Sequence, residues 1–353
     1  MKKLFLLLIL ISITKTFSQT NKELALSKAR EAIQLMDNGE IDKSVELLKE
    51  GEKLDPENYL FSYEIAYAYV LKKDYKKAAD ILKKTKKFEV INSQVYQMLG
   101  NCYSYLGQPK KAIKEYEEGM KRFPNAGNLH LEKGNIFNQE EQYNEAIKNY
   151  ENGIKVDPMY PSNYYQLALL YLNSNDKLSG LIYGEIFMNI ERTTNRTIEI
   201  SELLYMTYKD AITLGEEESK IDFCEIVIDA KSVTKDDLTL PLCAIFGKNF
   251  VFGILGQKEF NLDTLSQMRN SFIDNYFTED YKTHPNVLFS YHKTLKDKGL
   301  FDAYNHYLFQ MGASEQFDSW LANNEEAFNT FKQWYISTDN TIEINQSNAF
   351  IKQ

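Results

Sequence analysis

A period of 34 residues constrains the fold of this chain more than any other feature. When the chain is cut at positions 25, 59, 93, 127 and 161, the eighth and twentieth positions of all five units hold small residues. A fixed period of this length is typical of stacked repeats, in which each unit packs on its neighbours. The small residues at the eighth position are Ala32, Ala66, Gly100, Gly134 and Ala168, and those at the twentieth are Ser44, Ala78, Ala112, Ala146 and Gly180.

The pattern predicts two antiparallel helices in each unit. Small side chains allow two helices to cross closely, and the eleventh position is always large enough to fill the space between units. Pro56, Pro124 and Pro158 stand where one helix ends and the next begins, because there the proline ring costs no hydrogen bond. We therefore expect an all-α fold. The residues at the eleventh position are Leu35, Tyr69, Tyr103, Phe137 and Tyr171.

The stretches LGNCYSYLGQPKKAIKEYEEGMKRFP and KGNIFNQEEQYNEAIKNYENGIKVDP carry this pattern most completely. They resemble the tetratricopeptide repeat (TPR) family. The resemblance covers residues 24–194 and implies a solenoid of about five helix-turn-helix repeats. After residue 194 the period is lost but helical patterns continue, so we expect the solenoid to continue into a helical C-terminal domain over residues 195–337, with a frayed polar tail over residues 338–353.

Residues 1–18 have the pattern of a secretory signal peptide. Lys2 and Lys3 precede an apolar run from Leu4 to Ile13, and the small residues Thr16 and Ser18 stand at the third and first positions before a cut after Ser18. A run of ten is too short to span a bilayer, which takes about 20 apolar residues. We expect an exported mature chain, most simply periplasmic, with no transmembrane segment after cleavage. The abundance of Lys, Asn, Ile and Tyr suggests a protein of Bacteroidota type.

Charge argues against a nucleic-acid partner. The chain has 41 Lys and Arg against 50 Asp and Glu, a formal charge of −9, whereas phosphate backbones need a concentrated cationic surface. One stretch, residues 72–87, is rich in lysine. It is either a solvated outer face or a contact to anionic envelope components, and the residues proposed for that contact are Lys72, Lys73, Lys76 and Lys77.

The resemblance also implies a concave surface formed by positions two, five, nine and twelve of each unit. An amide can donate and accept at once, so it can pair with the main chain of a bound peptide. Asn101 and Asn135 both occupy position nine, which gives two rungs of an asparagine ladder. The surface is either a peptide site or a hydrated polar face. The candidate groove residues are Tyr63, Tyr67, Gln94, Gln97, Asn101, Asn128, Asn135, Asn138 and Tyr165.

No catalytic motif, metal-ligand spacing or cofactor fingerprint is found, so we expect no catalytic residues, metal or cofactor. The primary expectation is a non-enzymatic scaffold or adaptor that binds a protein segment. The alternative is a C-terminal domain that binds a small ligand or carbohydrate, or is enzymatic, with His292, His306 and Trp320 converging on a pocket. Cys224 and Cys243 either pair in an oxidising compartment or are buried small residues like Cys102.

Overall fold

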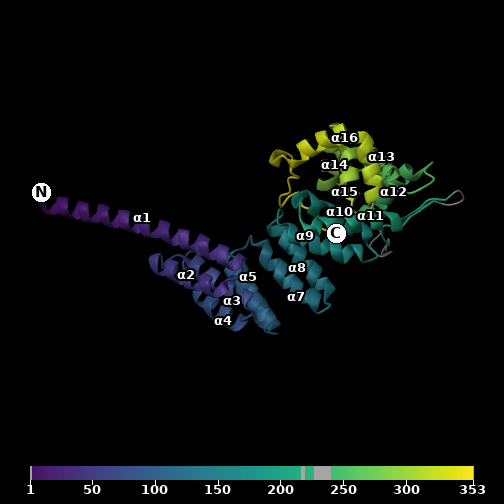
Figure 1. The fold of residues 1–353 in the computed structure, drawn as a ribbon. Coiled ribbons are helices and arrows are strands. Elements are labelled where there is room, and N and C mark those ends of the chain that lie inside the picture. The colour runs from purple at the N-terminus through teal and green to yellow at the C-terminus, as the bar shows by residue number, and fades with distance from the viewer. Residues whose placement is uncertain (1, 216–218, 226–239, 353) are drawn as a thin grey trace. The chain divides into compact units, whose positions relative to one another are not determined.

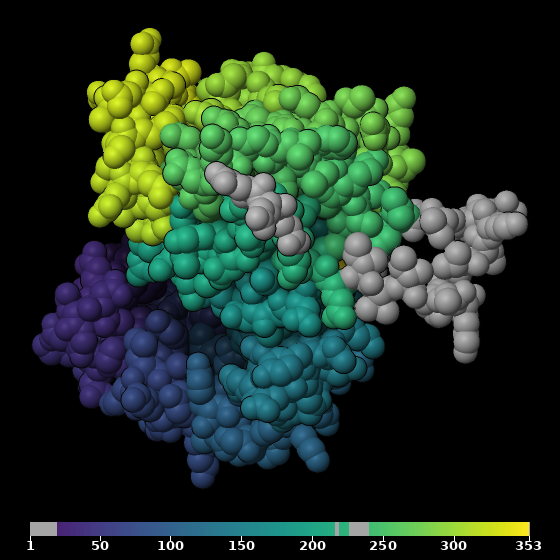
Figure 2. Space-filling model, turned by 90° about the vertical axis from the view of Figure 1, so that its right-hand side faces the viewer, coloured from purple at the N-terminus to yellow at the C-terminus, as the bar shows by residue number. Residues whose placement is uncertain are grey.

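The computed structural model describes residues 2–215, 219–225 and 240–352, with side chains from residue 20 onward. The described elements are helices apart from two strands of two residues each (Figure 1), which confirms the all-α prediction. The chain divides into two compact units, Met1–Ala146 and Ile147–Gln353, which can be followed by the residue-number colours in Figure 2. The domain bounds predicted from the sequence stay predictions beside this division.

The first unit is a stack of helix pairs. In α1/α2, α3/α4 and α5/α6 the two helices of one repeat pack together, while α2/α3, α4/α5 and α6/α7 join successive repeats. The helix α8, Tyr143–Val156, begins at the end of this unit. The helices of the first unit are α1 (Lys2–Asp37), α2 (Ile41–Leu54), α3 (Tyr59–Leu71), α4 (Tyr75–Thr85), α5 (Gln94–Tyr105), α6 (Pro109–Arg122) and α7 (Gly127–Gln139).

Residues 1–18, the predicted signal peptide, have no described side chains, so that prediction stays a prediction. Within the described part of the chain, no helix combines the length and the apolar character needed to cross a membrane.

The turn inside each repeat has the same backbone conformation four times. Gly39, Lys73, Gly107 and Glu141 have φ values of +80°, +58°, +69° and +59°, and they are spaced 34 residues apart. Glycine adopts this left-handed conformation without steric cost, whereas a residue with a Cβ is strained there. The repeat is therefore a property of the backbone as well as of the packed side chains.

The small positions lie where the helices cross. The alanines at positions eight and twenty are fully buried, among them Ala66 and Ala112. A Cβ added to Gly100 would collide with the ring of Tyr116, and one added to Gly180 would come within 2.5 Å of the backbone nitrogen of Leu172. Close crossing of the paired helices, predicted from the sequence, is therefore confirmed.

The second unit is built around α10, in which every residue from 178 to 189 is buried. A helix that is buried and mostly apolar on all sides is typical of a protein interior. The helices α9, α11 and α14 pack against it. The further helices of this unit are α9 (Pro161–Leu172), α10 (Lys177–Ile190), α11 (Asn195–Ala211), α12 (Leu242–Ile254), α13 (Leu262–Glu279), α14 (Val287–Asp297), α15 (Phe301–Phe309) and α16 (Ser314–Ile336), followed by the short 3-10 helix η1 (Thr338–Asn340).

A small disulfide-linked segment interrupts the helices. The strands β1 (Ile212–Thr213) and β2 (Lys220–Ile221) pair antiparallel directly after α11. Cys224 and Cys243 form a disulfide with their Cα atoms 6.4 Å apart, so of the two alternatives for this pair the structure has the bond. Cys102 is a free, buried thiol in α5.

The expectation that residues 338–353 fray is wrong for the described part of that segment. Ile342 and Ile344 are 2% and 6% exposed. The ring of Phe350 lies 5.0 Å from that of Tyr183, centroid to centroid. The Nζ of Lys352 forms an ion pair of 2.6 Å with Asp176. The segment is polar in overall composition, but a few of its apolar side chains pack against the rest of the second unit.

Candidate functional site

The helices α3, α5 and α7 form one face of the first unit. They are the first helices of successive repeats, and α5 packs against both of the others. Residues at i, i+4 and i+7 of a helix share one face. Leu60 and Tyr67 therefore lie on the same face of α3, as do Asn128 and Asn135 on α7. We call the surface of α3, α5 and α7 that carries these residues the repeat face.

A network of half-buried polar groups joins α5 and α7 on the repeat face. Asn128 Nδ2 donates to Gln97 Oε1 at 2.7 Å, and Gln97 Nε2 donates to Glu132 Oε1 at 2.7 Å. Asn135 Nδ2 donates to Glu132 Oε2 at 3.2 Å, and the Ser93 hydroxyl donates to Asn128 Oδ1 at 3.0 Å. The amides are therefore held in fixed orientations, which lowers the entropy lost when a ligand binds them.

The two asparagines of the predicted ladder already bond within the protein. Asn101 Oδ1 accepts from the hydroxyl of Tyr116 at 2.5 Å, while Asn135 donates to Glu132. Gln94 Oε1 accepts from Asn92 Nδ2 at 3.0 Å, and Asn138 is half-buried. The predicted positions thus lie on neighbouring helices, and part of their hydrogen-bonding capacity is used internally.

The α3 part of the repeat face is apolar and aromatic. Leu60 is 43% exposed and Tyr67 is 40% exposed. Tyr63 is half-buried against the core of the unit, and burial raises its pKa to about 12. At the groove positions, α3 therefore offers apolar and aromatic side chains, whereas α5 and α7 offer mainly amides.

Tyr165, the last candidate groove residue, belongs to α9 in the second unit. Its hydroxyl donates to Glu199 at 2.6 Å, and burial raises its pKa to about 12. Arg196 lies 4.8 Å from the centre of its ring and donates to the Ser162 hydroxyl at 3.1 Å. Both hydrogen bonds join residues 34 apart, so α11 packs on α9 in the register of the repeat. Sequence reasoning did not find this register after residue 194.

Sequence reasoning missed the two acidic residues on the repeat face, Glu64 and Glu132. Both occupy the sixth position of their units, which the resemblance did not single out. The signal was nevertheless in the sequence, because each lies four residues after a predicted groove position, Leu60 or Asn128.

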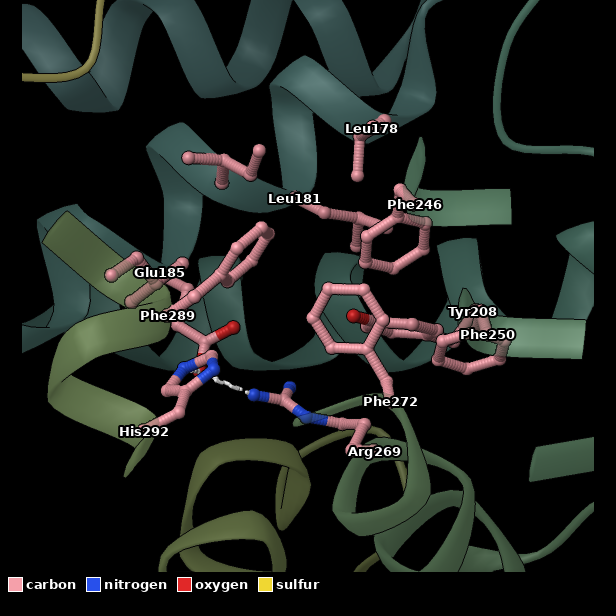
Figure 3. Close-up of a pocket in the computed structure, with 12 residues that line it drawn as sticks. Leu178, Leu181, Glu185, Tyr208, Phe246, Phe250, Arg269, Phe272, Phe289 and His292 are labelled. Atoms are coloured by element: carbon pink, nitrogen blue, oxygen red, sulfur yellow. Dashed lines mark hydrogen bonds and ion pairs between the residues drawn. The ribbon is translucent and has the colours of Figure 1, made fainter. Parts of the chain in front are cut away.

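The second unit contains a buried charged cluster (Figure 3). Oε1 of Glu185, on α10, accepts from Arg269 Nη2 of α13 at 2.6 Å and contacts His292 Nε2 of α14 at 2.6 Å. It also accepts from the hydroxyl of Tyr304 on α15 at 2.8 Å. Glu185, Arg269 and His292 are each 3% exposed. One carboxylate therefore joins four helices of the unit.

The pKa values of the cluster explain its protonation. Burial alone would raise the pKa of Glu185, but Arg269 and His292 outweigh it and hold that pKa at about 2. Burial lowers the pKa of His292 despite the opposing effect of Glu185. At neutral pH the imidazole is therefore uncharged and donates its Nε2 proton to Glu185. Burial opposes the charge of Arg269, yet Glu185 raises the pKa of that guanidinium, so the ion pair is Glu185–Arg269.

A pocket beside this cluster is small. Its apolar wall includes Leu181, Tyr208, Phe246 and Phe272, and Figure 3 shows these side chains around its centre. The centre of a water molecule could occupy about 10 Å³ of it, which is room for about one water. This pocket does not accommodate an organic substrate.

The three residues proposed to converge on a C-terminal pocket do not form one site. His292 belongs to the Glu185 cluster, whereas the ring of His306 stacks on Trp320 at 4.1 Å between centroids and its Nε2 lies 3.0 Å from Asp263. Within the described ranges, no set of three or more His, Cys, Asp or Glu is placed to hold a metal ion.

The lysines proposed for an anionic contact differ in their surroundings. Lys72 forms an ion pair of 2.6 Å with Asp42. Lys77 lies over the ring of Tyr69, 4.2 Å from its centre. Lys73 and Lys76 are exposed.

Comparison with known families matches the repeats directly. Residues 30–87 and 93–126 match models described as tetratricopeptide repeat, and residues 134–175 match one described as TPR repeat. These three stretches of the chain are TPR repeats by sequence. The resemblance inferred from the 34-residue pattern is thereby confirmed over residues 30–87, 93–126 and 134–175.

Several solved proteins, two of them described as TPR proteins, are similar to about half of the chain. The thermophilic TPR protein TTC0263 of Thermus thermophilus is 17% identical, with 51% of this chain and 98% of that one covered and a TM-score of 0.43. YrrB, described as a TPR protein with an unusual peptide-binding site, is 22% identical over 52% of this chain and 94% of its own, with a TM-score of 0.34. PilF of Pseudomonas aeruginosa is 14% identical over 54% and 86%, with a TM-score of 0.44.

Proposed function

We propose that this TPR protein is a non-enzymatic scaffold that holds an extended segment of a partner protein against the repeat face. The observation that carries the proposal is the network of Gln97, Asn128 and Glu132, in which half-buried amides lie in fixed orientations at the surface. Amides so placed can bond the main chain of a peptide without selecting its side chains. The aromatic residues of α3 offer apolar contact beside them.

We also propose where the protein acts. The signal-like residues 1–18 and the Cys224–Cys243 disulfide both support export to an oxidising compartment, and we propose the periplasm of a Bacteroidota-type cell. Intact-mass measurement of the protein from envelope fractions tests this part: the expected mass is that of a chain beginning at Gln19.

We also propose a contact between the lysine-rich stretch, residues 72–87, and anionic envelope components. Lys72 is paired with Asp42, so Lys73 and Lys76 are the residues better placed for it. A small-ligand or enzymatic role for the second unit has less support, because the pocket beside Glu185 has room for about one water.

Site-specific photocrosslinking in cells tests the scaffold proposal. A photoreactive phenylalanine analogue at Tyr67, which is exposed on the repeat face, is expected to capture a protein that the same analogue at Lys84, exposed on α4, does not. The Gln97→Ala/Asn128→Ala variant should reduce capture at Tyr67 while its circular dichroism stays that of the parent. Equal capture from both positions would contradict the proposal.

A further inference from the structure

The repeat face carries a carboxylate that no described residue neutralises. Glu64 lies one turn after Leu60 and one turn before Tyr67 on α3, so it shares their face. It is half-buried, and burial raises its pKa above the usual value for glutamate. Across the described residues its carboxylate makes no hydrogen bond or ion pair. Desolvation is thus the cause of the shift, and no donor offsets it.

A second carboxylate on this face has only neutral partners. Glu132 accepts hydrogen bonds from the amides of Gln97 and Asn135, which leave its negative charge in place. The adjacent Lys133 does not pair with Glu132, because its Nζ forms an ion pair with Oε1 of Glu117 at 2.7 Å. Glu132 is therefore oriented by its neighbours, and no lysine or arginine among the described residues pairs with it.

The groove positions of α3, α5 and α7 contain no lysine or arginine to balance these acids. They hold instead the apolar, aromatic and amide residues Leu60, Tyr63, Tyr67, Val70, Gln94, Gln97, Asn101, Ser104, Asn128, Leu131, Asn135 and Asn138. A ligand with positive charge would supply what this face lacks.

An apolar area borders the acids on one side. Leu60 and Tyr67 are 43% and 40% exposed on α3, and Leu26 and Ile33 of α1 are 44% and 42% exposed at the corresponding positions of the preceding repeat. Isolated exposed apolar residues are common, but four at equivalent positions of successive repeats form an ordered surface.

We infer that the segment bound by the repeat face is basic, an inference that rests on the proposed function. Its lysine or arginine side chains pair with Glu64 and Glu132, and its apolar side chains contact the exposed apolar residues of α1 and α3. Adjacent packed helices lie about 8–10 Å apart, so α3 and α7 are separated by about 16–20 Å. An extended chain advances about 3.3 Å per residue, which sets the two basic residues about five or six positions apart.

Selection from a displayed library of random peptides, each about twice as long as that spacing, tests this inference with the full mature protein. The parent is expected to enrich peptides containing two basic residues about five or six positions apart. The isosteric Glu64→Gln/Glu132→Gln variant should still enrich peptides but without the preference for lysine and arginine. Glu46→Gln/Glu89→Gln, which removes two exposed acids outside the repeat face, is the matched control and should select as the parent does.

Affinity gives a second readout. A selected basic peptide is expected to bind about fivefold more weakly to Glu64→Gln/Glu132→Gln, the effect of losing two partly exposed ion pairs, and with unchanged affinity to the control. Enriched peptides without basic residues, or equal binding to both variants, would overturn this inference and leave peptide binding intact. Failure of the parent to enrich any peptide would overturn the proposed function and this inference together.

Discussion

At the scale of single residues, the left-handed turn inside each repeat gives a direct test of backbone strain. Lys73 has φ +58° at a position where the first and third repeats have glycine. Lys73→Gly is expected to stabilise the protein by about 1 kcal/mol, because glycine adopts this conformation without the clash that a Cβ suffers. The change would be measured by urea denaturation followed by circular dichroism.

The neighbouring lysine supplies the control. Lys72 has φ −75° at the end of α3, where glycine relieves no strain, so Lys72→Gly should lower the stability. If both substitutions lowered it equally, the left-handed turn would not be the source of the effect.

Some single residues could be predicted from the sequence and others could not. The small positions of the repeat were predictable because one physical cause, close helix crossing, acts at a fixed spacing. Glu185, Arg269 and His292 were not, since they come from three separate helices and share no spacing. A buried polar cluster of this kind is specified by the tertiary fold, which a single sequence does not display.

At the scale of elements, the same contrast applies to α11. Its register on α9 was missed because position eight of that unit is Glu202 rather than a small residue, and the described residues of the unit after α11 form no second helix. The register survives through Arg196 and Glu199, which contact residues 34 positions earlier. The 34-residue register therefore continues into α11 as contacts between polar side chains, although the small residues that marked it in the sequence are absent there.

The C-terminal segment gives a prediction about packing. Ile342→Ala and Ile344→Ala are each expected to destabilise the second unit by about 2 kcal/mol or more, because each removes buried methyl groups and leaves a cavity. Thermal unfolding followed by circular dichroism measures the loss. Glu343→Ala, between them and exposed, should change stability by less than about 0.5 kcal/mol; a similar loss in all three variants would mean that the segment does not pack as described.

The disulfide-linked segment gives a prediction about oxidation state. Denatured protein prepared without reductant should show one reactive thiol, that of Cys102, and three after reduction. Opening the loop between Cys224 and Cys243, which are 19 positions apart, should cost about 3 kcal/mol because the unfolded chain regains conformational freedom. Three thiols before reduction would show that the bond does not form in the protein.

At the scale of the whole molecule, the stability of the second unit should depend on pH through the buried cluster. The folded pKa of Glu185 is about 2, below its ordinary value of 4.5, so its contribution is complete above about pH 4.5 and is lost as the pH falls toward 2. The folded pKa of His292 is also lowered, so the unfolded chain binds a proton first and stability declines as the pH falls below 6.5. Both groups therefore destabilise the unit in acid.

The variant Glu185→Gln separates this effect from general acid unfolding. Two and a half pKa units correspond to about 3 kcal/mol, so the variant should be less stable than the parent by about that amount at pH 7, with the difference shrinking toward pH 2. Urea denaturation at a series of pH values measures it. Glu326→Gln, an exposed acid on α16, should follow the parent throughout. A constant difference between Glu185→Gln and the parent across the series would mean that the charge of Glu185 does not stabilise the fold, since protonating the parent removes the same charge that the substitution does.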